Sequence, residues 1–133
     1  MSADAFIDTN VLLYVLAASS PEATRAEEIL QSGAVVSVQV LNEFANVGRK
    51  KFGMTVADIR DVLEAIRKFC TVQNLDIATH ELGLDIAERY GFSVYDSMLL
   101  AAAQKANCST FFSEDMQHGQ RIGGLTIRNP FKP

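Results

Sequence analysis

The fold of this chain is decided by its opening stretch, Ala5-Phe6-Ile7-Asp8-Thr9-Asn10-Val11-Leu12-Leu13. Small and apolar residues lead directly into an aspartate, and an apolar run follows the Thr-Asn pair. This pattern predicts a buried first strand that ends in an acid, with a helix starting at once. A carboxylate at the end of a buried strand is costly to desolvate unless a cation, a helix N-terminus or hydrogen bonds compensate. Asp8 therefore raises the question of whether the chain supplies further acids in equivalent positions.

Beyond this stretch, helical patterns alternate with short apolar runs. Strands are predicted at residues 34–38, 71–75, 109–113 and 125–127, and helices at residues 21–31, 39–51, 56–69, 77–90 and 97–106. Ser20-Pro21 is typical of a helix start, and Gly53 and Gly91 are typical of helix ends. Helices that alternate with buried strands predict an α/β fold, a parallel sheet with helices on both faces. Residues 1–133 are expected to form one domain.

Composition narrows the class of protein. The chain has 133 residues, 48% of them hydrophobic, and 12 Lys and Arg against 16 Asp and Glu give a net charge of −4. This balance does not favour simple electrostatic binding of nucleic acid, but acids clustered around divalent cations cease to repel phosphate. Cys70 and Cys108 lack metal-binding spacing and are expected to be reduced thiols. No apolar run approaches the roughly 18 residues of a membrane span, and no signal peptide is apparent, so a cytoplasmic location is expected.

Four acids are predicted to meet at one edge of the sheet. Asp8 and Asp115 fall at strand ends, Asp96 begins a helix, and Glu43 lies one turn into the helix after the second strand. Ligands of such sheets bind outside the carboxyl ends of the strands. Four carboxylates would repel one another without positive charge, and Mg²⁺ or Mn²⁺ would resolve this repulsion. One or two such ions can activate a water and stabilise in-line displacement at a phosphodiester.

Each acid also has a simpler interpretation. Asp96 and Asp115 could be caps of a helix and a turn, Asp8 could cap the helix that follows it, and Glu43 could be a surface acid at the border of its helix. Glu114 competes with Asp115, and the spacing alone does not decide which of them points inward. His118 and His80 could be ligands or general bases, although neither has a partner at ligand spacing.

The acids lie in motifs that resemble those of a known family across nearly the whole chain. The motifs are Phe6-Ile7-Asp8-Thr9-Asn10-Val11-Leu12, Asn42-Glu43-Phe44, Tyr95-Asp96-Ser97-Met98-Leu99-Leu100-Ala101-Ala102 and Ser113-Glu114-Asp115. In this order and at these separations they resemble a PIN-domain ribonuclease, most closely the VapC toxins of toxin–antitoxin pairs. The short motifs are moderately specific one by one and highly specific together.

The resemblance implies a three-layer α/β/α fold with a parallel sheet of four or five strands. It implies an endoribonuclease that depends on Mg²⁺, or on Mn²⁺ in its place, and it makes Asp8, Glu43, Asp96 and Asp115 the metal-binding and catalytic set. Thr9, Asn10 and Ser113 match supporting positions, and the Ser113 match favours Asp115 over Glu114. Ser97 departs from the pattern, because the family more often has Ala after the aspartate.

The resemblance also implies partners. It predicts a homodimer and an antitoxin protein whose C-terminal segment closes the acidic pocket, often with an arginine. An arginine that binds one of these carboxylates with two hydrogen bonds would compete with the cation. The RNA backbone needs cationic contacts, and Arg49 and Lys50, on the same helix as Glu43, are candidates; their alternative role is a solvated helix end that complements the helix dipole.

Three other functions are compatible with parts of the pattern. The protein could be a PIN nuclease of RNA processing without an antitoxin, which genomic context would distinguish. It could be a catalytically inert PIN-like binding module, although the presence of all four acids speaks against that. A nucleotide-binding regulatory domain is a further option, which the absence of a Gly-rich turn after the first strand makes less favourable.

Overall fold

The computed structural model of the protein describes residues 4–17 and 19–132. Its centre is a six-stranded sheet with strand order β3-β2-β1-β4-β6-β5. The strands are β1 (Ala5–Ile7), β2 (Ala34–Ser37), β3 (Cys70–Gln73), β4 (Thr110–Phe112), β5 (Arg121–Ile122) and β6 (Leu125–Arg128). Strands β1, β2, β3, β4 and β6 are parallel, and β5 pairs antiparallel with β6 at one edge. The prediction of a parallel sheet is confirmed.

Strand β5 was not predicted from the sequence. It has only two residues, an exposed Arg121 and a buried Ile122, which is too short for a periodic pattern to show. The strand exists because Gly123, with a φ of 61°, turns the chain back so that Arg121 and Ile122 pair with Thr126 and Leu125.

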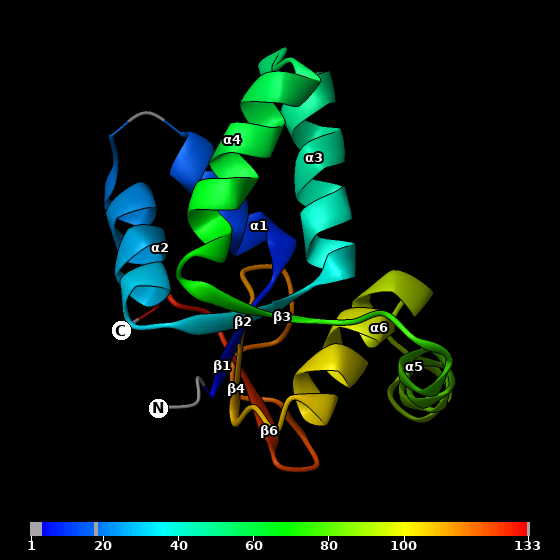
Figure 1. Ribbon diagram of the computed structural model, residues 1–133. Coiled ribbons are helices and arrows are strands. Elements are labelled where there is room, and N and C mark those ends of the chain that lie inside the picture. Colours follow the sequence, from blue (N-terminus) through cyan, green and yellow to red (C-terminus); the bar gives the residue numbers. More distant parts are fainter. Residues whose placement is uncertain (1–3, 18, 133) are drawn as a thin grey trace.

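Helices form the two outer layers. They are α1 (Thr9–Leu12), the 3₁₀ turn η1 (Leu13–Leu16), α2 (Pro21–Gln31), α3 (Val38–Phe52), α4 (Val56–Arg67), α5 (Ile77–Tyr90) and α6 (Val94–Lys105). Helices α1 to α4 lie over one face of the sheet, and α6 covers the other face with α5 outside it (Figure 1). The three-layer α/β/α arrangement is therefore confirmed. No helix in the described residues is long and apolar enough to cross a membrane.

Several boundaries differ from the prediction by a few residues. Val38 was expected in the second strand but begins α3, because the Ser37 hydroxyl accepts a hydrogen bond from Val40 N and caps the helix. Helix α6 begins at Val94 rather than near Ser97, because Ser93 is its N-cap. The sequence identified the helix start at Ser20, which caps α2, but it did not show the caps at Ser37 and Ser93.

Helix α6 is the most buried helix, since all seven residues from Ser97 to Ala103 are buried. Small side chains let it approach both the sheet and α5. On α5, a Cβ atom added at Gly83 would lie 2.5 Å from the sulfur of Met98, so this helix crossing depends on a glycine. The close approach holds the first turn of α6, which carries Asp96, in a fixed position beside the sheet.

The two central strands are held in register by aromatic stacking. Phe6 on β1 pairs with Phe111 on β4, and their parallel rings lie 5.2 Å apart in the fully buried core. The same register pairs Ile7 with Phe112, so both strands end at the same level. Asp8 and Ser113, the residues that follow these ends, are therefore neighbours although 105 positions separate them.

Candidate active site

The candidate site lies at the carboxyl ends of β1 and β4. From β1 the chain proceeds to β2 on one side, whereas β4 lies on the other side, so the sheet has its topological switch point between β1 and β4. Connections leave in opposite directions there, and the crevice between them is where open α/β sheets bind ligands. Asp8 follows one of these strands and Ser113 the other.

Asp8 is buried and well supported by hydrogen bonds. Its Oδ1 accepts from the backbone N–H of Thr9 at 2.7 Å, and its Oδ2 accepts from the Ser113 hydroxyl at 2.9 Å. Asp8 is thus the N-cap of α1, as one interpretation of the sequence held, but it also joins the two central strands. Its side chain is only 6% exposed, so the cost of ionising it must be offset locally.

Glu43 reaches the same crevice from α3. The Thr9 hydroxyl donates to Glu43 Oε1 at 2.6 Å, and the Gln39 side-chain amide donates to Oε2 at 3.0 Å. Gln39 and Glu43 lie one helical turn apart, so the amide is placed by helix geometry. Glu43 is accordingly not a free surface acid, since both of its oxygens are engaged at the crevice.

Asp96 lies in the first turn of α6 and is not the helix cap. Ser93 caps the helix, and its hydroxyl accepts from Asp96 N at 3.2 Å. The Asp96 side chain lines the crevice, where the positive end of the helix dipole favours a negative charge. The arrangement resembles a capping box in spacing but uses only the serine half.

Asp115 and Glu114 are distinguished by their partners. The Asn10 side-chain amide donates to Asp115 Oδ2, whereas the Tyr14 hydroxyl donates to both oxygens of Glu114, at 2.8 and 3.0 Å. Ser113 caps the turn by accepting from the backbone N–H of Asp115 and Met116. The Asp115 side chain therefore caps nothing, and Asp115 lines the crevice while Glu114 is held beside η1.

Together these residues enclose an acidic cavity of about 310 Å³. Its lining is Asp8, Thr9, Asn10, Leu13, Glu43, Asn46, Val47, Asp96 and Asp115. The predicted acids and the supporting residues Thr9 and Asn10 thus share one cavity, with Ser113 directly behind Asp8. Within the described residues there is one ion pair, Arg25 with Glu28 on α2, so no lysine or arginine in that part of the chain neutralises the four carboxylates.

Burial and repulsion between the acids raise the pKa values of Asp8 and Asp96. Burial raises the pKa of Asp8 to about 7, although the hydrogen bonds from Ser113 and Thr9 lower it, and the charges of Asp96 and Glu43 raise it further. Burial is also the main cause of a raised pKa at Asp96, to which Glu43 and Asp115 add repulsion. Strongly perturbed acids in a cleft are typical of functional sites.

Oxygen atoms dominate the possible ligands of the cavity. Besides the carboxylates, the side-chain oxygen of Asn10 is buried without a hydrogen-bond partner. Hard divalent cations prefer such a set of ligands. In the part of the chain that is described, no three His, Cys, Asp or Glu side chains stand close enough to enclose an ion.

The histidines lie outside the acidic cavity. His118 Nδ1 accepts from the backbone N–H of Asn129 at 2.9 Å, so this side chain supports the C-terminal segment. His80 lines a different hollow, formed mainly by apolar residues of α5 and α6. Arg49 and Lys50 are exposed at the far end of α3.

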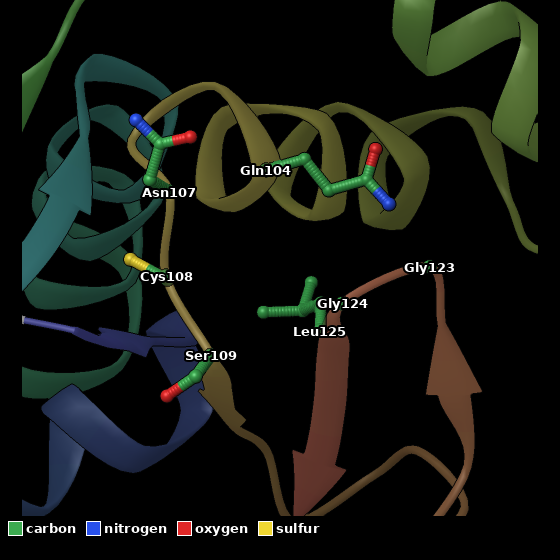
Figure 2. A pocket seen from close by; sticks show the side chains of 7 residues that line it. All are labelled: Gln104, Asn107, Cys108, Ser109, Gly123, Gly124 and Leu125. Carbon is green, nitrogen blue, oxygen red and sulfur yellow. The ribbon is translucent and has the colours of Figure 1, made fainter.

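A second polar cavity, of about 470 Å³, lies at the amino ends of β4 and β6, whereas the acidic cavity lies at the carboxyl ends of β1 and β4. Figure 2 shows it between the end of α6, the segment before β4 and the turn between β5 and β6. Its lining residues include Gln104, Asn107, Cys108 and Ser109 but no carboxylate. This cavity therefore offers no paired acids, and the free thiols Cys70 and Cys108 do not line the acidic cavity.

Three residues at or beside the site were missed by sequence reasoning. Asn46 lines the cavity one turn after Glu43, Gln39 positions Glu43, and Tyr14 holds Glu114. The spacing 39, 43, 46 is a helical signal that a search along α3 from Glu43 could have found. Tyr14 gave no such signal, because its contact joins residues 100 positions apart.

Comparison with protein families assigns this architecture. The fold and the site define a class, the three-layer α/β proteins with an acidic cavity at the switch point. The sequence matches the model of the PIN domain over residues 5–121. The chain belongs to the PIN-domain family. Comparison with curated protein sequences gives no match.

Solved structures share the fold. VapC20 of Mycobacterium tuberculosis, a sarcin–ricin loop cleaving toxin, has a TM-score of 0.67 at 19% identity, covering 84% of this chain and 91% of that one. A toxin–antitoxin complex from Klebsiella pneumoniae has a TM-score of 0.73 at 19% identity, covering 97% and 99%. DNA-bound VapBC from Salmonella typhimurium has a TM-score of 0.72 at 17% identity, covering 96% and 98%. At these identities the likeness establishes the fold.

Proposed function

We propose that this protein is a metal-dependent endoribonuclease and the toxin of a toxin–antitoxin pair. The observation that carries the proposal is the convergence of Asp8, Glu43, Asp96 and Asp115 on one cavity without a cationic side chain among the described residues to neutralise them. Membership of the PIN-domain family and the similarity to toxin structures support the same activity. RNA is the proposed substrate, and a cytoplasmic location belongs to the proposal.

Mg²⁺, or Mn²⁺ in its place, fits the residues of the cavity. Asp8, Asp96 and Asp115 are the proposed ligands, with Glu43 as a fourth, and the partnerless oxygen of Asn10 fits the same hard set. Among the described residues no three of these side chains are close enough to enclose an ion by themselves, so the proposed ion would keep several waters, as Mg²⁺ usually does. When bound, such an ion supplies positive charge that favours ionisation of the attacking water and stabilises the charge that develops at the phosphodiester.

The remaining residues hold the acids in place. Ser113 and the Thr9 backbone orient Asp8, the Thr9 hydroxyl orients Glu43, and Asn10 orients Asp115. A site held by such contacts is organised before substrate arrives, so little reorganisation is needed during the reaction. No protein nucleophile is required, since the attacking group is water.

The deciding experiment is cleavage of labelled RNA in Mg²⁺ or Mn²⁺ by wild type and by Asp8→Asn. The substitution keeps the size and the hydrogen-bond acceptor but removes the charge, so we expect loss of cleavage by about 100-fold or more. Chelation with EDTA should abolish cleavage by wild type. Equal activity in the two proteins, or activity that survives EDTA, would refute the proposed mechanism.

An antitoxin and a second copy of the chain are the proposed protein partners. An arginine of the antitoxin placed against Asp96 or Asp115 would form charge-assisted hydrogen bonds and displace the cation. Affinity purification of this chain from its native host should therefore recover a second, smaller protein. Recovery of this chain alone would count against a tight antitoxin, and sedimentation as a monomer would count against the homodimer.

A further inference from the structure

An apolar hollow of about 710 Å³ lies where the first turns of α3, α5 and α6 meet. Its apolar lining consists of Leu75, Ile77, Val94, Tyr95 and Met98. Ile77 is 76% exposed and Tyr95 is 66% exposed, which is unusual for large apolar side chains gathered in one place. The polar groups in its lining are Gln39, His80, the Tyr95 hydroxyl and Asp76, whose Oδ1 accepts from Thr79 as the N-cap of α5.

Neighbouring residues connect the hollow with the acidic cavity at two points. Tyr95 lines the hollow and Asp96, the next residue, lines the cavity. Gln39 lines the hollow and donates its hydrogen bond to Glu43 in the cavity. A molecule held at the carboxylates through a cation therefore has the hollow as its immediate neighbour on the α5–α6 side.

The shape and chemistry of the hollow fit a small planar group. Its volume lies within the range of about 300–1,000 Å³ that small-ligand pockets occupy. A nucleobase presents an apolar face and a polar edge, which match the ring of Tyr95 and the side chains of Gln39 and His80. Proteins hold single-stranded RNA by stacking bases on aromatic side chains.

We propose that this hollow binds the base of a nucleotide adjacent to the scissile phosphate, with Tyr95 stacked on its face. The inference rests on the ribonuclease activity proposed above and identifies where the substrate's sequence is read. The lining of the acidic cavity is rich in carboxylates, which suit a cation and a phosphate, and it contains no aromatic side chain that could discriminate bases by stacking. The neighbouring hollow would supply that discrimination.

The test uses short single-stranded RNAs that carry the fluorescent base 2-aminopurine at successive positions. Binding is measured in Ca²⁺, a hard cation that takes oxygen ligands and can offset the charge of the carboxylates, and a gel confirms that the RNA stays intact, so that base stacking is observed independently of catalysis. Wild type should quench the fluorescence at one position more than at the others. Tyr95→Phe retains the ring and should bind with nearly wild-type affinity, whereas Tyr95→Leu retains only apolarity and should lose roughly tenfold or more.

Phe69→Leu is the control, because it removes a half-exposed ring next to the start of β3, whereas the hollow lies beyond the other end of that strand. It should leave RNA affinity unchanged. Equal RNA affinity of Tyr95→Leu and wild type would overturn the inference. If Tyr95→Leu in addition changed the oligomeric state measured by sedimentation, the hollow would be covered by a second copy of the chain instead. Position-specific quenching without cleavage in Mg²⁺ would uphold the base site and refute the nuclease.

Discussion

Glu114 and Asp115 are consecutive acids whose side chains have different surroundings. Glu114 is occupied by the Tyr14 hydroxyl, and that bond, as the largest cause, raises the pKa of Tyr14 to about 12. Asp115 lies in the cavity with Asn10. A difference of one position along the chain thus separates an acid that anchors η1 from one that faces the other carboxylates.

The two acids make a matched pair of variants. We expect Asp115→Asn to lower the rate of RNA cleavage by about 100-fold, because it removes charge from the proposed metal site. Glu114→Gln should keep the rate within about threefold, since Tyr14 can still donate to the amide oxygen. Initial rates in Mg²⁺ provide the measurement, and the opposite order of effects would assign the fourth acid to Glu114.

Asp8 should make stability depend on pH in the absence of divalent cations. Burial raises its pKa to about 7 in the folded protein, against about 3.9 in an unfolded chain. Between these values Asp8 binds more protons in the folded state than in the unfolded state, so its contribution to the free energy of unfolding is largest below about pH 4, falls as the pH rises and levels off above 7. The decrease should be on the order of 2 to 4 kcal/mol.

Urea unfolding in EDTA at a series of pH values measures this dependence. Asp8→Asn cannot ionise and should lose most of the decrease, so it should be more stable than wild type at pH 8 and nearly equal to it at low pH. A wild type whose stability is constant or increases between pH 5 and 8 would show that Asp8 ionises normally.

Ser97 carries a cost that the sequence did not reveal. Its hydroxyl is fully buried and has no hydrogen-bond partner among the described residues. Ser97→Ala removes an unsatisfied polar group and adds a better helix former, so it should raise the free energy of unfolding by about 1 kcal/mol. Urea unfolding tests this, with Ser97→Val as a control for over-packing; a loss of stability in Ser97→Ala would imply that the hydroxyl has a partner.

At the scale of elements, α3 connects the cavity to a basic end. Glu43, Asn46 and Val47 line the cavity, and Lys50 continues the same face one turn further. Arg49, Lys50 and Lys51 occupy the last turn, where they also complement the helix dipole. The helix thus places cationic side chains one to two turns from the acids. Phosphates that flank the cleavage position could reach these cationic side chains.

We expect Arg49→Ala combined with Lys50→Ala to weaken RNA binding and to flatten its dependence on salt. Each phosphate contact that is lost lowers the slope of log affinity against log salt by roughly 0.7 for single strands. Arg67→Ala combined with Lys68→Ala removes the same charge at the C-terminal end of α4, next to the start of β3, and should leave the slope unchanged. Identical slopes for wild type and the α3 variant would exclude these residues from the RNA path.

At the scale of the whole molecule, the cavity joins elements from most of the chain. It combines residues that follow β1 and β4 with residues of α1, α3 and α6. The binding site therefore exists only in the folded state. Ligands that bind only the folded state stabilise it by mass action, by about 2.7 kcal/mol at 100 times the dissociation constant. The proposed cation should therefore act on the stability of the entire domain.

Thermal unfolding should show this linkage. The midpoint for wild type should rise with the concentration of Mn²⁺ or Mg²⁺, and Glu114→Gln should show the same rise. The rise should be much smaller in a variant that combines Asp8→Asn with Asp96→Asn, which removes two proposed ligands. A rise of equal size in all three proteins would indicate cation binding elsewhere on the surface.

Much of the fold could be predicted from local patterns. The alternation of buried runs such as residues 34–37 with helical stretches such as residues 77–90 determines an α/β protein, because period and burial are properties of neighbouring residues. Asp8 could be identified early for the same reason: an acid at the end of a buried strand is conspicuous in the sequence alone. The order of the four acid motifs likewise needed no coordinates.

Only the tertiary structure decided which side chains meet. The choice between Glu114 and Asp115 depends on Tyr14 and Asn10, about 100 positions away, and the cap of α6 depends on which hydroxyl reaches a free N–H. The short strand β5 and the hollow beside Tyr95 arise from contacts between elements. The physical reason is that hydrogen-bond partners and cavities are set by sheet register and helix packing, which local sequence does not encode.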